Sequence, residues 1–312
     1  MQANKKRMLG VYLRGIAMGA ADVVPGVSGG TVAFITGIYE ELLNSIKAIN
    51  PRALIVLKNE GVKSFWSSIN GSFLLALLLG ILTSIISLAR LIAHVLEAQP
   101  LLIWSFFFGL IVASSFHMVK QLKQWSWQLL LAMCVGGIFA FAIGEMKPSE
   151  IAVDPLVVFA AGSIAICAMI LPGISGSFIL VLLGMYSHLL NAIKEFQWLL
   201  LVSFAAGCAV GLLSFSHLLA WLFKRFHDIT VALLTGFLIG SLNMVWPWKE
   251  TLSYYHNSKG EQLALEQQNV LPAVYEAIYK LDSNWPMCLG LMFLGFLLVL
   301  SLEKIGSLSS NK

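Results

Sequence analysis

Charged residues are scarce in this chain of 312 residues. Asp, Glu, Lys and Arg make up 12% of it and hydrophobic residues 58%, whereas charged residues reach about 25% in a typical soluble domain. This shortage excludes an ordinary soluble fold and indicates a protein of the lipid bilayer. The net charge of +4 comes mainly from Lys and Arg in short loops, a pattern typical of membrane orientation, so we expect no nucleic-acid partner.

Cysteine is also rare, and the sequence motifs of common catalytic sites are missing. The four cysteines lie in apolar stretches without metal or redox spacing, so we interpret them as free thiols. The chain has no P-loop, no HExxH, no GxSxG and no dinucleotide fingerprint. We therefore expect no catalytic residues, no bound metal and no cofactor, and hence a protein that is not an enzyme.

One short phrase occurs twice. Residues 25–30 read PGVSGG, and residues 172–177 read PGISGS. The 25-residue stretches that start at the two prolines share 11 identities, where shared composition alone would give about two. The chain is therefore an internal duplication. In both copies the phrase interrupts an apolar segment, and interrupted helices at corresponding positions of two halves are typical of a transporter's central binding site.

Further apolar runs predict the membrane spans. A run of about 20 residues crosses the hydrocarbon core, and six runs qualify, at residues 71–96, 101–119, 125–144, 198–223, 229–245 and 285–302. The broken apolar pairs at residues 8–49 and 155–196 predict re-entrant hairpins with their tips near the midplane. Matches such as Gly80 with Gly207 and Gly109 with Gly236 extend the duplication beyond the hairpins.

We expect an all-α polytopic membrane protein of two inverted repeats, residues 1–150 and 151–312, in a single membrane domain. Each repeat would hold one re-entrant helical hairpin and three transmembrane helices, and an odd number of crossings inverts the second repeat. Thirteen Lys and Arg fall in the expected cytoplasmic loops and five in the outer ones, which places both termini in the cytoplasm. The long outer segment, residues 249–284, contains a predicted interfacial helix at 272–281.

The two hairpin tips are the candidate substrate site. Proline ends the incoming helix, glycine permits close backbone approach, and the next helix begins with free N–H groups that suit an anion such as phosphate. The alternative is that these small residues only allow tight helix packing. The candidate substrate-binding residues of the tips are Pro25, Gly26, Ser28, Gly29, Gly30, Thr31, Pro172, Gly173, Ser175, Gly176 and Ser177.

Ionisable residues inside a membrane are costly and therefore candidates for function. Arg14 and Asp22 occur in the first hairpin only. Arg14 would neutralise an anionic headgroup, or it reaches to the membrane interface instead. Asp22 would couple transport to H⁺ or Na⁺ and contact the substrate, or it caps N–H groups of the tip. Glu40 is a second coupling candidate, with solvated surface charge as its alternative.

These motifs resemble the signature of the PopT-type polyprenyl-phosphate transporter family. The resemblance rests on RGIAMGAADVVPGVSGGT at residues 14–31, GIYE at 37–40, LPGISGS at 171–177 and GMY at 184–186, and it spans essentially the whole chain. It implies a flippase that returns undecaprenyl phosphate, a lipid carrier of peptidoglycan and cell-envelope synthesis, from the outer to the inner leaflet of the bacterial cytoplasmic membrane for recycling. The implied partners are this lipid and the surrounding membrane lipids.

Two other classes of function compete with this one. An ion-coupled transporter or channel for a small soluble anion would use the same tips without a lipid-facing opening. A membrane lipid phosphatase would need a nucleophile or base beside the phosphate, and Asp22 with Ser28 is the only local pair. We rank the phosphatase last because no histidine lies near this pair in the sequence. No pattern in the sequence specifies the coupling ion or the oligomeric state.

Overall fold

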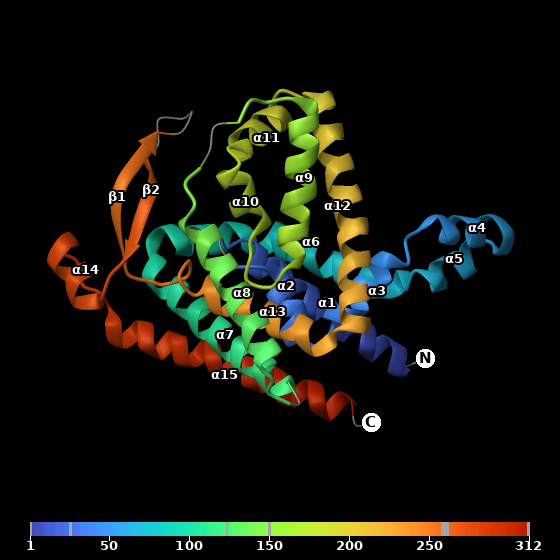
Figure 1. Ribbon diagram of the computed structural model, residues 1–312, viewed down its shortest axis with the longest axis horizontal. Helices are drawn as coiled ribbons and strands as arrows, with labels where there is room; N and C mark the ends of the chain where they lie inside the picture. Colours follow the sequence, from blue (N-terminus) through green and yellow to red (C-terminus); the bar gives the residue numbers. More distant parts are fainter. Residues whose placement is uncertain (1, 25–26, 123, 149–150, 257–261, 311–312) are drawn as a thin grey trace.

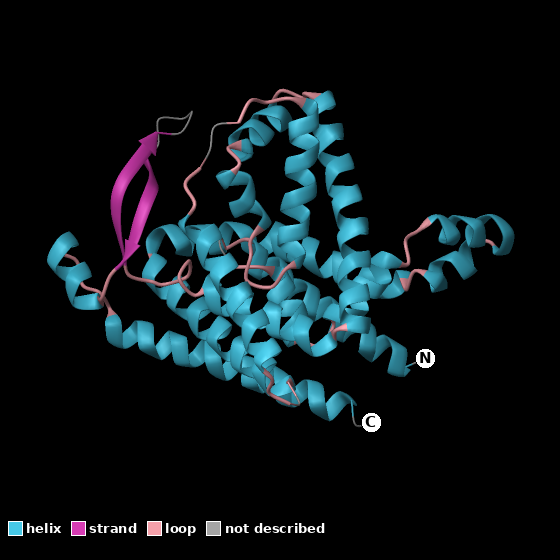
Figure 2. Ribbon diagram, in the orientation of Figure 1, coloured by secondary structure: helices cyan, strands magenta, loops and turns pink. Residues whose placement is uncertain are grey.

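The computed structural model describes residues 2–24, 27–122, 124–148, 151–256 and 262–310, and these are mostly helical (Figure 2). The elements are α1 (Gln2–Asp22), α2 (Gly29–Ile35), α3 (Tyr39–Lys47), α4 (Pro51–Glu60), α5 (Val62–Ser68), α6 (Gly71–Ala98), α7 (Pro100–Gln121), α8 (Trp127–Glu145), α9 (Pro155–Ile170), α10 (Gly176–Leu182), α11 (Met185–Lys194), α12 (Trp198–Arg225), α13 (His227–Ser241), β1 (Lys249–His256), β2 (Gln262–Asn269), α14 (Pro272–Tyr279) and α15 (Trp285–Ser310).

The duplication reappears in where the helices begin and end. Gly80 and Gly207 are 127 positions apart, and the bounds of α6 moved by that distance are the bounds of α12. The prolines of the repeated phrase are 147 positions apart, and α2 moved by that distance coincides with α10. The same apolar patterns and breaks therefore set equal lengths for these two pairs of helices.

The two halves exchange their last long helices. α1 packs along α6, and α9 packs along α12, so these pairs correspond within each half. α7, however, packs along α15, and α8 packs along α13. Because α7 corresponds to α13 and α8 to α15 in chain order, the third long helix of each half packs against the other half. Neither half completes its core alone.

Glycines permit the close crossings of these exchanged helices. A Cβ atom on Gly109 of α7 would overlap the carbonyl oxygen of Met292 in α15. On Gly236 of α13, the equivalent position, a Cβ would overlap the carbonyl oxygen of Met133 in α8. Such backbone-to-backbone contact is what small residues at helix interfaces make available in membranes.

Four of the described helices are long and apolar enough to cross a membrane, namely α6, α7, α8 and α12. The helices α10 and α11, bent by 103° at their junction, make a fifth candidate if they count as one span. The chain is therefore a multi-pass membrane protein. Four of the six predicted spans are confirmed. The apolar helical stretches at the other two, His227–Ser241 and Trp285–Ser301, are shorter.

The span predicted at residues 229–245 is too long. α13 ends at Ser241, and the chain then turns. In this turn the Asn243 side chain donates a hydrogen bond to Glu145 Oε1 at 2.6 Å. Apolar composition alone marks the turn as part of the span, because Met244, Val245 and the tryptophans around it are hydrophobic.

The prediction of an all-helical protein missed one β-hairpin. β1 and β2 pair antiparallel, with Lys249 opposite Asn269 and His256 opposite Gln262. Thr, Tyr and Leu residues in β1 have the alternation and strand propensity that this structure needs. The helix predicted at residues 272–281 is confirmed as α14.

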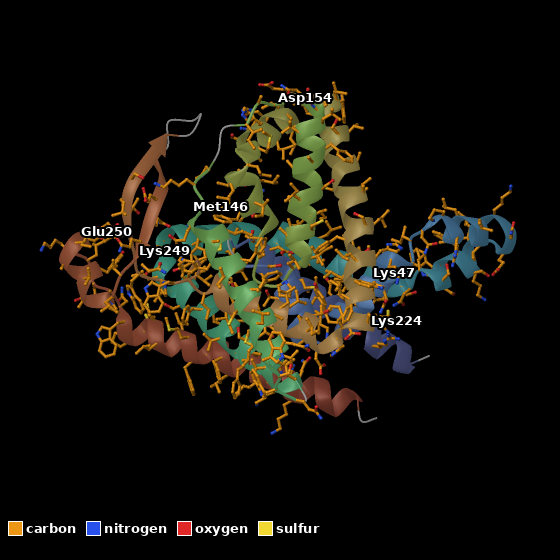
Figure 3. The ribbon with its side chains drawn as sticks, in the orientation of Figure 1. Lys47, Met146, Asp154, Lys224, Lys249 and Glu250 are labelled. Carbon is orange, nitrogen blue, oxygen red and sulfur yellow. The ribbon has the colours of Figure 1, made fainter. Side chains whose placement is uncertain are left out.

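α1 begins and α15 ends at the same end of the molecule, at the lower right of Figure 1. The β-hairpin and α14 lie at the opposite end, on the left of the same view. Lys47 and Lys224, from loops predicted to be cytoplasmic, lie toward the end that holds the two termini (Figure 3). Met146 and Lys249, from loops predicted to be outside, lie toward the β-hairpin (Figure 3).

Candidate functional site

Tip one, residues 22–31, joins α1 to α2, and its described part binds the first N–H groups of α2. Asp22 Oδ1 accepts a hydrogen bond from the Gly29 N–H at 2.7 Å. Ser28 Oγ accepts one from the Gly30 N–H at 3.1 Å, and the Ser28 carbonyl accepts one from the Thr31 N–H at 2.9 Å. The start of α2 is therefore capped by Asp22 and Ser28, as N-cap residues do.

Tip one is in direct contact with tip two, residues 169–177, which joins α9 to α10. Ser28 Oγ donates to the Met169 carbonyl oxygen at 2.9 Å. Thr31 Oγ1 accepts a hydrogen bond from the Gly173 N–H at 3.0 Å. Ser28 and Thr31 are fully buried. Two breaks 147 residues apart in the sequence therefore meet in the protein core.

Tyr39 strengthens this contact from α3. Its hydroxyl donates to the Ile170 carbonyl oxygen at 3.1 Å, and its ring lies 5.2 Å from that of Phe34 and 5.8 Å from that of Phe223. A Cβ atom on Gly30 would also overlap the Ile170 carbonyl oxygen. This tyrosine thus links tip one, tip two and α12. In the sequence this tyrosine is part of the signature at residues 37–40, and no local pattern assigns it a role.

Tip two is built differently. Ser175 precedes α10 and makes no side-chain cap bond to it. Its hydroxyl is instead 2.9 Å from that of Ser177, which is exposed. The second copy has Met169 where the first has Asp22, so it lacks the capping carboxylate. The first turn of α10 is therefore the one without a side-chain cap and without a negative charge of its own.

A cavity of about 630 Å³ lies between the β-hairpin and helices α7, α8 and α10. Phe178, Val181 and Leu182 of α10 form part of its wall. Ser177 lies one helical turn before Val181 and therefore on the same face of α10. The cavity and tip two thus share one face of this helix. The sequence contains no local signal for the cavity, because its walls come from separate segments.

Lys249 is a partly buried cation of this cavity. Its Nζ donates to the Met244 carbonyl oxygen at 2.7 Å and lies 5.8 Å from the centre of the Trp104 ring. Burial lowers the pKa of Lys249 to about 8, and the negative charge of Glu145 acts against this shift. Figure 3 shows Lys249 near the base of the β-hairpin. Sequence analysis counted this lysine only as one of the outer charges.

The remaining candidates lie apart from the tip contacts. Arg14 is half-buried in α1, and the charged group that acts on it is Glu41, which also binds Arg7 at 2.6 Å. Glu40 is exposed and its Oε1 lies 3.6 Å from His227 Nε2.

The other predicted residues belong to the tips. Pro172 and Gly176 are buried in tip two. Two predicted site residues lie outside the described part of the chain, namely Pro25 and Gly26.

The described residues include no cluster of three His, Cys, Asp or Glu side chains that could hold a metal ion. The described tips therefore offer hydroxyls, one carboxylate and backbone N–H groups. This donor set suits an oxyanion better than a metal.

The family model described as VCA0040-like, undecaprenyl phosphate translocase-like, matches residues 18–263. This chain belongs to that family. A polyprenyl-phosphate transporter of Vibrio cholerae serotype O1 is 52% identical to it over 304 residues, which cover 97% of this chain and 99% of that protein. A polyprenyl-phosphate transporter of Staphylococcus aureus is 32% identical over 253 residues, or 75% and 85% of the two chains. No solved structure matches the chain significantly. The resemblance read from the two motifs is confirmed.

Proposed function

We propose that this protein is a transporter that moves polyprenyl phosphate, specifically undecaprenyl phosphate, across the bacterial cytoplasmic membrane. The main support is the buried contact between tip one and tip two. At this contact the first turn of α10 has no side-chain cap. Two broken helices that meet inside a membrane protein form a site typical of transporters. The two relatives named polyprenyl-phosphate transporter, which align over most of this chain, support the same substrate.

The proposed architecture is a pair of inverted repeats, residues 1–150 and 151–312, with re-entrant hairpins at 8–49 and 155–196. The repeated helix bounds and the exchange of α8 and α15 between halves support it. Both termini are cytoplasmic in this arrangement. The excess of Lys and Arg in the loops at that end supports the orientation.

The phosphate binds at tip two in this proposal. Ser175, Gly176 and Ser177 supply hydroxyls and N–H groups that no carboxylate of the same tip opposes. Ser28 and Thr31 of tip one already bond to tip two. They become available to the phosphate only when the two tips separate, so separation of the tips is the step that passes the headgroup from one side to the other.

Transport runs from the outer to the inner leaflet in this proposal. The cavity beside α10 lies toward the β-hairpin, at the end opposite both termini, which supports loading from outside. Asp22 is the proposed coupling residue for H⁺ or Na⁺, because an ionised carboxylate next to a phosphate site repels the substrate. Glu40, beside His227, is the second candidate and lies nearer the cytoplasmic end.

Reconstitution tests the proposal directly. Purified protein is placed in liposomes with labelled undecaprenyl phosphate, and both leaflet distribution and released inorganic phosphate are followed over time. We expect leaflet exchange without phosphate release. Free phosphate as a product would instead make the protein a lipid phosphatase, and transport of soluble phosphate without lipid movement would make it a soluble-anion transporter.

Serine variants test the site. Loss of one hydrogen bond to a charged group costs about 1.5 to 3 kcal/mol, or roughly ten- to a hundredfold in affinity. We therefore expect Ser177→Ala and Ser175→Ala to weaken substrate binding by that factor. The matched control is Ser214→Ala on α12, an exposed serine whose hydroxyl bonds within its own helix. Equal affinity in all three variants would mean that tip two has a structural role only.

A further inference from the structure

Lys249 stands out among the described lysines because it is partly buried and makes no ion pair at contact distance, although the charge of Glu145 acts on it from farther away. Within the described part of the chain, no carboxylate oxygen lies within 4.0 Å of its Nζ. The one hydrogen bond it donates goes to the Met244 carbonyl oxygen. An ammonium has three N–H donors, so two remain for a ligand in the cavity. A buried cation of this kind costs free energy unless an anion joins it.

Beside Lys249 the described cavity wall holds one ion pair and one further carboxylate. Glu145 at the end of α8 accepts a hydrogen bond from Asn243, and Lys147 binds Glu266 of β2 at 2.9 Å. α7 and α10 contribute no charged side chain to the wall. Lys249 is therefore the one cation of the described wall without an ion-pair partner within 4.0 Å, and Glu145 acts on it from a greater distance.

Part of the cavity wall is apolar. Trp104 of α7 and Phe178, Val181 and Leu182 of α10 line it. A volume of about 630 Å³ holds more than a phosphate group, within the usual range of small-molecule sites. A cation beside an aromatic and aliphatic wall matches a phosphate with a hydrocarbon chain attached.

We propose that this cavity is the entry site for the prenyl phosphate, in which Lys249 pairs with the phosphate and the α10 wall receives the first isoprene units. This inference rests on the proposed function. Val181 and Ser177 lie on the same face of α10, and Ser177 is one helical turn nearer to tip two. The headgroup thus passes along α10 from Lys249 to tip two. Substrate in the cavity then lies against α10, which begins at tip two and moves when the two tips separate.

The charge states of both groups support pairing at neutral pH. The pKa of Lys249, about 8, keeps most of its ammonium charged at pH 7. A phosphate monoester has lost its second proton near pH 6. Its charge is therefore constant between pH 8 and 10, and a fall in affinity over that range reports loss of the lysine proton. Glu145, Lys147 and Glu266 are the other charged groups that face the cavity.

Binding measurements on the full-length protein test the entry site. Farnesyl phosphate serves as the short soluble probe, with inorganic phosphate and farnesol as comparison ligands, in isothermal titration at pH 7. We expect Lys249→Met to weaken farnesyl phosphate binding ten- to a hundredfold, and Lys249→Arg to retain most of it. The matched control is Lys280→Met, an exposed lysine after α14 at the same end of the molecule, which should bind as the wild type does.

Transport kinetics separate this proposal from the proposed function. An entry site raises the KM for undecaprenyl phosphate in Lys249→Met and leaves kcat nearly unchanged. Wild-type affinity and KM in Lys249→Met would overturn the entry site alone, whereas a wild-type protein that moves no undecaprenyl phosphate would overturn the proposed function. Equal affinity for inorganic and farnesyl phosphate would remove the α10 wall from recognition and overturn the lipid assignment.

Discussion

Asp22 caps one tip, and no carboxylate caps the other. Its bond to the Gly29 N–H is one that an asparagine oxygen can also accept. We expect Asp22→Asn to keep the stability of the wild type, and Asp22→Ala to lose about 1 kcal/mol, the usual value of an N-cap. Thermal unfolding in one detergent measures this difference.

The asparagine variant also tests whether Asp22 couples transport to an ion gradient. Because asparagine cannot carry the charge, we expect Asp22→Asn to bind undecaprenyl phosphate but to transport it at the same rate with and without an imposed H⁺ or Na⁺ gradient. A gradient response equal to that of the wild type would leave Asp22 as a cap and remove it from the coupling step.

The lowered pKa of Lys249 predicts how the stability of the protein depends on pH. Its pKa is about 8 in the folded protein and 10.5 in the unfolded reference, so the unfolded chain binds more protons between these values. Stability of the wild type should therefore rise with pH through this window. Because methionine carries no charge, we expect the stability advantage of Lys249→Met over the wild type to be largest at pH 7, at most about 3 kcal/mol, and to shrink as the pH rises towards 10.5.

Thermal unfolding of both proteins at several pH values checks this, with Lys280→Met as the control that should show no such trend. If Lys249→Met is less stable than the wild type at pH 7, the hydrogen bond from Lys249 to the Met244 carbonyl stabilises the fold by more than burial of the charge destabilises it. The lysine would then have a structural role.

The crossing of α8 and α13 depends on the missing side chains of Gly136, Gly236 and Gly240. A Cβ on Gly236 would overlap backbone atoms of Met133 that have no freedom to rotate away. We expect Gly236→Leu to separate the two helices and to cost 1 to 3 kcal/mol or more, as overpacking does. A Cβ added to Gly290 on α15 would meet no atom within 4 Å. Gly290→Leu is therefore the matched control and should have the same melting temperature as the wild type. Equal melting temperatures for both variants would contradict this account.

The whole molecule has an orientation that labelling can test. Lys58 of α4 and Lys280 after α14 are both exposed and lie in loops predicted on opposite sides. After replacement of Cys134, Cys167, Cys208 and Cys288, single cysteines at these two positions should react with a membrane-impermeant thiol reagent from opposite faces of intact cells. Reaction of both from the same face would contradict the inverted arrangement.

Local composition was sufficient for the parts of this protein that depend on local physics. A bilayer demands long apolar helices, and a Pro-Gly break ends a helix wherever it stands. The spans at α6, α7, α8 and α12, the equal lengths of α2 and α10, and the helix α14 could therefore be predicted. The family signature is local as well, because the breaks and the residues beside them carry it.

Tertiary packing decided what no short stretch of sequence encodes. Only the folded chain pairs α7 with α15 and α8 with α13, because several glycine-bearing faces could pack equally well by composition. Strands β1 and β2 form by pairing with each other, which overrides a weak local signal. Lys249 is partly buried beside Trp104 and Met244, which come from separate parts of the chain. Its low pKa is a property of that assembled cavity, since desolvation depends on every wall at once.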